Sequence, residues 1–123
     1  MKPVDRPAFD RGLRLFNSAE FYDAHEVWED VWRPLPPSTE KKFLQGLIQI
    51  AVGLHHHGTG NSVGALSLLR RGSHNLRHSR TDVLSIDVDE FLVAVDGWSE
   101  ALKSHLPLPS FPRIVKLENR PNV

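Results

Sequence analysis

The feature that most constrains the fold is the stretch from Phe43 to Leu54, which carries no charged side chain. Its apolar residues fall on nearly every side of a helix, as is typical of a helix enclosed by other helices. The stretch is too short to span a bilayer and contains two glutamines. Gly46 and Gly53 lie on one helical face, and because glycine costs about 1 kcal/mol relative to alanine inside a helix, close packing is the expected reason for both. The sequence therefore predicts a bundle with this helix at its centre.

Four more helical segments are predicted around the central one, and no strand. Each carries an apolar stripe and is bounded by capping residues, glycines or prolines. The five segments are expected from Pro7 to the interruption at Asn17, from Glu20 to Trp32, from a cap at Ser38 or Thr39 to His57, from Ser62 to His78, and from a capping box at Asp87 and Glu90 to His105.

The region after the last helix contains prolines at positions 107, 109 and 112 and is expected to be extended. Phe111, Ile114 and Leu117 are the residues expected to pin this tail, residues 106–123, to the bundle. The predicted fold class is therefore all-α: a single-domain bundle of about five helices over residues 1–123, with an extended, proline-rich C-terminal tail.

Composition and charge narrow the functional classes. The chain has no cysteine, which excludes disulfides, thiol catalysis and cysteine-ligated zinc. No signal-peptide pattern is present near Lys2, so a cytoplasmic protein without a membrane segment is expected. The net charge is zero, but residues 41–80 contain six bases and no acids, between two acidic regions. Charge pairing between helices is the expected explanation, and a nucleic-acid partner is not favoured.

The stretch FYDAHEVWEDVW contains the first candidate site. On a helix, His25 and Glu29 lie one turn apart, at the boundary between an aromatic face and an acidic face. Such a pair can share one divalent metal ion, although the H-E-x-x-H motif is not matched and two ligands are too few. His25 is the candidate acid, base or metal ligand. Glu29 would orient His25 or bind the metal with it, and Glu26 is a second candidate catalytic carboxylate.

The central helix offers polar partners for this pair. Gln45, Gln49 and His56 fall along one line of an otherwise apolar helix. Buried polar groups need hydrogen-bond partners, and an antiparallel second helix would supply His25, Glu26 and Glu29. The hypothesis is a His/Glu/Gln pocket between the second and third helices. Structural polar packing, a ligand or catalytic pocket, and a metal site all remain open for this cluster.

A second candidate is the basic stretch LLRRGSHNLRHSR. Arg70, His74 and Arg77 share one helical face, and Arg71 lies beside it. Anionic ligands or RNA phosphates could dock there. The alternative is a solvated face whose charges pair with the acids of the second or fifth helix.

Two motifs resemble those of a known family. The stretch A-H-E-x-x-E-x-x-W, from Ala24 to Trp32, is followed by F-L-Q-G-L-I-Q, from Phe43 to Gln49, then by a histidine and a G-N pair. In this order they resemble the domain of unknown function 309, over about residues 8–78. The resemblance implies a small, all-helical microbial domain and no established reaction. Matched by motif position, the candidate ligand-binding residues are Trp32, Gln45, Gln49, His55 or His56, and Asn61.

Whether the protein is an enzyme stays open at this point. Two non-enzymatic alternatives stand beside the pocket hypothesis. One is a protein–protein interaction module or homo-oligomer, because paired helices with short turns present grooves to partners. The other is an RNA-associated protein that uses the basic 70–80 stretch.

Overall fold

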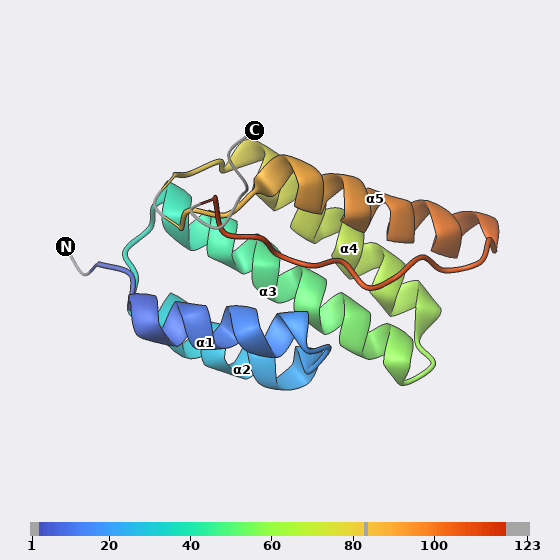
Figure 1. Ribbon diagram of the computed structural model, residues 1–123, viewed down its shortest axis with the longest axis horizontal. Coiled ribbons are helices and arrows are strands. Elements are labelled where there is room, and N and C mark those ends of the chain that lie inside the picture. The colour runs from blue at the N-terminus through green and yellow to red at the C-terminus, as the bar shows by residue number, and fades with distance from the viewer. Residues whose placement is uncertain (1–2, 83, 118–123) are drawn as a thin grey trace.

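The computed structural model describes residues 3–82 and 84–117. Within these ranges the chain forms five helices and no strand (Figure 1). The predicted all-α bundle is therefore confirmed, with helix ends within one or two residues of those expected. The helices are α1 (Arg6–Asn17), α2 (Phe21–Trp32), α3 (Thr39–Gly58), α4 (Ser62–His78) and α5 (Val88–Ser104).

The side-chain caps that the sequence predicts explain where three of the helices begin. Ser38 accepts a hydrogen bond from the Lys41 amide, Asn61 from the Gly64 amide, and Asp87 from the Glu90 amide. Each cap satisfies one of the amide groups that the first turn of a helix leaves without a partner. These three caps are the ones that the sequence predicts.

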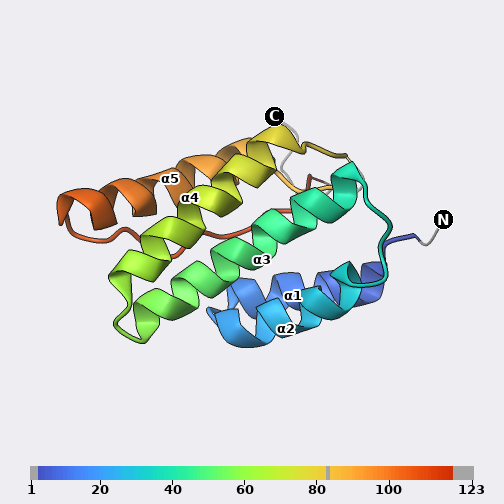
Figure 2. The same ribbon diagram turned by 180° about the vertical axis from the view of Figure 1, so that it is seen from behind.

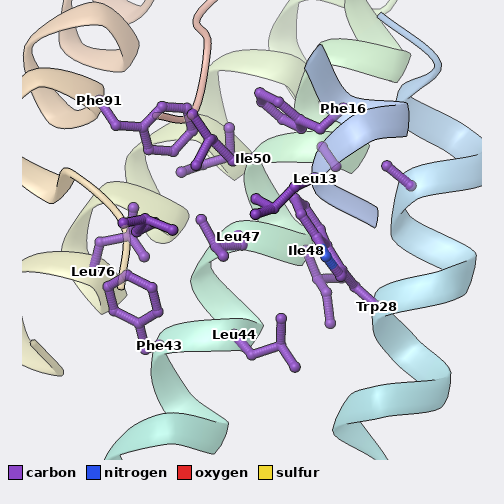
Figure 3. Close-up of a cluster of buried hydrophobic side chains, with 14 of the residues drawn as sticks. Leu13, Phe16, Trp28, Phe43, Leu44, Leu47, Ile48, Ile50, Leu76 and Phe91 are labelled. Carbon is purple, nitrogen blue, oxygen red and sulfur yellow. The ribbon is translucent and has the colours of Figure 1, made fainter. Parts of the chain in front are cut away.

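The helices form two antiparallel pairs on either side of α3. The α1–α2 pair lies on one side of α3 and the α4–α5 pair on the other, as the two opposite views show (Figures 1 and 2). Phe43, Leu44, Leu47 and Ile50 of α3 are completely buried, and Trp28 of α2 lies in the same cluster (Figure 3). The prediction that the uncharged stretch Phe43–Leu54 lies at the centre of the bundle is confirmed. No described helix is long and apolar enough to cross a membrane.

Glycines set how closely α3 and α4 approach. A Cβ atom on Gly46 would lie 2.9 Å from the carbonyl oxygen of Gly72, and one on Gly53 would lie 3.2 Å from the carbonyl oxygen of Ala65. Both distances are shorter than ordinary van der Waals contact. Close helix packing is thus the reason for both α3 glycines, as predicted, and α4 is the helix that they admit.

The tail runs back along the bundle between α5 and α1 (Figure 1). The Asn17 side chain donates to the Ile114 carbonyl at 2.9 Å and accepts from the Ile114 amide at 2.8 Å. Phe111 stacks on Trp98 with ring centroids 5.3 Å apart. Leu117 is held by its backbone amide, which donates to Ser85, while its side chain is 42% exposed. The predicted extended tail is present to residue 117, and residues 118–123 lie outside the described part.

Candidate functional site

His25 is anchored by its own helix. Its Nδ1 atom lies 2.6 Å from the carbonyl oxygen of Tyr22, and because a carbonyl can only accept, Nδ1 carries the hydrogen. The other ring nitrogen, Nε2, faces Glu29 Oε1 at 3.7 Å, which is too long for a hydrogen bond. The His25 side chain is only 15% exposed. Both edges of the imidazole therefore already face acceptor oxygens of α2.

An aromatic group covers the seam between α2 and α3 around His25. The Tyr22 ring lies 4.8 Å from the His25 ring and 5.1 Å from the ring of His55 on α3, centroid to centroid. The rings of His55 and His56 are 6.3 Å apart. Of the two histidines that match the family motif, His55 is thus the one that approaches α2 residues through its ring.

Glu29 has a second partner. Its Oε2 atom accepts a hydrogen bond from Arg33 at 3.0 Å, and Arg33 also pairs with Asp30 at 2.8 Å. Glu26, the remaining candidate carboxylate, is exposed to solvent. Among residues 3–82 and 84–117, no group of three or more His, Cys, Asp or Glu side chains is placed to hold a metal ion. The structure therefore does not support the predicted metal pocket.

Trp32 and Gln45 lie at the other end of the same seam. Trp32 donates its indole hydrogen to the Lys41 carbonyl at 3.1 Å, and the Lys41 ammonium lies 4.3 Å from the centre of the Trp32 ring. Both residues line a surface hollow of about 260 Å³ that also includes Gln45. These contacts tie the end of α2 to the start of α3, which is a structural role for Trp32.

Gln49 turns toward α4 instead of α2. Its Oε1 atom accepts a hydrogen bond from Asn75 Nδ2 at 2.7 Å. Within the described residues, neither His25 nor Glu29 hydrogen-bonds to Gln45 or Gln49. Four side chains were expected in one pocket. His25, Glu29 and Gln45 lie on the α2 side of α3, whereas Gln49 faces α4.

The Gln49–Asn75 pair forms part of a second hollow, between α3 and α4. It has a volume of about 390 Å³ and is open to solvent, and we call it the α3–α4 hollow. Asn75 is 9% exposed, so a buried amide is held against the edge of an accessible space. The residues that line the hollow are Gln49, Arg70, Arg71, His74 and Asn75.

The other arginines of the basic stretch are engaged elsewhere. Arg77 pairs with Asp96 and Arg80 pairs with Asp89, so both contact acids of α5. This is the charge pairing between helices that the sequence suggested for the basic block. Arg70 and Arg71 make no ion pair with any carboxylate of the described part of the chain. The basic stretch therefore divides into a paired half and a half that faces the α3–α4 hollow.

The remaining candidate, Asn61, has a structural position. Its side chain is exposed and accepts the Gly64 amide hydrogen at the start of α4, and its own amide donates to the His56 carbonyl. Asn61 thus joins the end of α3 to the start of α4. This arrangement explains a G-N pair at this position without a ligand.

The comparisons agree with the motifs. Residues 9–68 match the family described as "Domain of unknown function (DUF309)". This confirms the resemblance over that part of the chain, and the match ends at Leu68, before the first arginine of the basic stretch.

Two similar proteins carry no assigned activity. Over 87 residues the chain is 29% identical to "Uncharacterized protein YpuF" of Bacillus subtilis (strain 168), a match that covers 69% of this chain and 50% of that protein. Over 75 residues it is 28% identical to an "Uncharacterized protein" of Aquifex aeolicus (strain VF5), a match that covers 61% of this chain and 22% of that one. The chain thus spans half or less of the length of these relatives.

Sequence reasoning missed Asn75, and a signal for it was present. Gly46 and Gly53 mark the face of α3 that α4 approaches, and Gln49 lies three residues after the first and four before the second. Residues at these spacings share a face of the helix, so Gln49 belongs to the α4 side. On α4, Gly72 marks the contact and Asn75 follows it by one turn.

A variant of His25 tests the metal hypothesis. Replacing His25 with alanine should lower the free energy of unfolding by about 1–2 kcal/mol, because the hydrogen bond to Tyr22 and a largely buried ring are lost. The loss should be the same with Zn²⁺, Mn²⁺, Mg²⁺ or EDTA in urea unfolding experiments. If Zn²⁺ stabilises the wild type, and both His25→Ala and Glu29→Gln abolish the gain, the metal site is real and this interpretation is wrong.

Proposed function

We propose that the protein is a small-molecule-binding domain and that its site is the α3–α4 hollow. The observation that carries the proposal is the hydrogen bond between Gln49 and Asn75, which holds two amides from neighbouring helices at the edge of an open space. A polar pair fixed in this way is pre-organised, since little side-chain freedom remains to be lost when a ligand binds.

The volume of the hollow is compatible with this function. Its volume of about 390 Å³ falls at the lower end of the range of about 300–1,000 Å³ that is typical of small-molecule sites. Arg70 and Arg71 also line the hollow, and the aliphatic stem of an arginine can supply apolar surface beside polar groups. A few fixed polar atoms in a partly apolar hollow are the usual composition of such a site.

The α3–α4 hollow is a better candidate than the seam around His25. At the seam, both imidazole nitrogens face oxygens of α2 and Glu29 is bound to Arg33. The Nε2 nitrogen, which a catalytic base would use, belongs to a His25 side chain that is only 15% exposed. The catalytic roles of His25, Glu26 and Glu29 stay predictions, as do cytoplasmic localisation, the single domain over residues 1–123, and an interaction or homo-oligomer surface.

The test is a fragment screen by thermal unfolding with a blocking variant. His74 is exposed and lines the hollow, so His74→Trp should fill the space without disturbing the core. Val63→Trp places the same ring at an exposed position, 84% accessible, near the start of the same helix. Both variants should fold like the wild type.

We expect fragments that stabilise the wild type to stabilise Val63→Trp equally and His74→Trp far less. A ligand at 100 times its dissociation constant stabilises the native state by about 2.7 kcal/mol, which such a screen detects readily. Fragments that stabilise all three proteins equally would place the binding elsewhere and refute the proposal.

A further inference from the structure

We propose that the ligand of the α3–α4 hollow is a small molecule with a phosphate group, an inference that rests on the proposed function. The charge around the hollow favours an anionic ligand. Arg70 and Arg71 line the hollow and have no carboxylate partner in the described part of the chain. No residue from 41 to 80 is acidic, so the α3 and α4 segments that form the walls carry only positive formal charge. An anionic group is the natural counter-charge.

The hydrogen-bonding capacity of the lining residues also favours a phosphate group. Each guanidinium offers five donors and no acceptor. Because Gln49 Oε1 already accepts the Asn75 hydrogen, the Gln49 amide nitrogen keeps both of its hydrogens for another partner. Arg71 donates one hydrogen bond to the Ser67 hydroxyl, 3.2 Å away on the same helix, and its other donors remain available. Donors thus dominate the hollow, and a phosphate group, whose oxygens accept several hydrogen bonds at once, suits such a set.

The number of arginines at the hollow limits the size of the ligand. Only two arginines of the basic stretch line the hollow, since Arg77 and Arg80 pair with Asp96 and Asp89. A nucleic-acid surface needs an extended basic patch, because its affinity comes from neutralising many phosphates along the backbone. Two guanidinium groups without a carboxylate partner, beside a hollow of about 390 Å³, fit one phosphate on a small molecule.

The test is a calorimetric titration with glycerol phosphate at constant ionic strength. The variants are Arg70→Gln, Arg71→Gln and the double variant. The control is Arg80→Gln, which also removes an exposed guanidinium but lies outside the hollow. We expect the double variant to bind at least about tenfold more weakly, as the loss of hydrogen bonds to a charged group implies. Arg80→Gln should bind like the wild type.

Equal binding by the wild type and the double variant would overturn the inference, as would the same loss in Arg80→Gln. If glycerol phosphate fails to bind while uncharged fragments stabilise the wild type but not His74→Trp, the phosphate inference fails and the proposed function stands. If neither binds, both fail. A short RNA that binds more tightly than glycerol phosphate, and loses affinity in Arg77→Gln and Arg80→Gln as well, would identify a nucleic-acid surface instead.

Discussion

Replacing Gly72 with alanine should lower the free energy of unfolding by about 2–3 kcal/mol, a large loss for the addition of one methyl group. The new Cβ atom would lie 2.5 Å from Ile50 Cγ1 and 2.7 Å from the carbonyl oxygen of Gly46. The second contact is with backbone, so the clash is relieved only if α3 and α4 move apart. Urea unfolding followed by circular dichroism measures the loss.

Gly97→Ala is the matched control. Gly97 lies inside α5, and a Cβ atom there would meet nothing within 4 Å. Since alanine favours helix more than glycine does, this variant should gain about 0.5–1 kcal/mol. Gly72→Ala as stable as the wild type would show that α3 and α4 are not held in such close contact, and the geometry of the α3–α4 hollow would then be wrong as well.

Replacing Trp28 with alanine should cost about 3–5 kcal/mol. The Trp28 side chain is completely buried and packs against the rings of Phe9 and Phe16, with centroids 6.0 Å and 5.8 Å away. Its indole also donates to the Phe9 carbonyl at 3.1 Å. Alanine would leave a large cavity where α1 and α2 meet, and the same unfolding measurement reports the loss.

Two variants serve as controls for this result. Trp28→Phe keeps an aromatic ring and should lose less than half as much. Val93→Ala removes apolar atoms from a side chain that is 74% exposed and should change stability by less than about 0.5 kcal/mol. A Trp28→Ala protein as stable as Val93→Ala would mean that the α1–α2 contact is not part of the main core.

The helices were predictable because local signals agree with one another. The caps at Ser38, Asn61 and Asp87 and the uncharged stretch of α3 depend on residues close in sequence. The path of the tail along the bundle was harder to predict from the sequence. Phe111 and Ile114 were recognisable as apolar anchors. The two hydrogen bonds between Asn17 and Ile114, however, join residues 97 positions apart, and no local sequence pattern predicts such a contact.

At the candidate site, too, the local features were predictable and the contacts between helices were not. Gln45, Gln49 and His56 lie on one line of the α3 helix, and helical periodicity predicts that line correctly. It does not say which neighbour each side chain meets, because the line runs along the boundary between the sides covered by α2 and α4. A rotation of a few tens of degrees decides between His25 and Asn75 as the partner of Gln49. Gly46 and Gly53 carried that information, because they mark the face of α3 that α4 approaches.

The most direct test of binding at the α3–α4 hollow is the NMR signal of the Gln49 and Asn75 side-chain amides during a titration with glycerol phosphate. Because these two amides are hydrogen-bonded to each other and line the hollow, both signals should shift together and saturate at one dissociation constant. The Arg80→Gln protein should give the same curve. If the Gln49 and Asn75 amides stay unchanged while signals elsewhere in the protein saturate, the ligand binds at another site and the α3–α4 hollow is not the binding site.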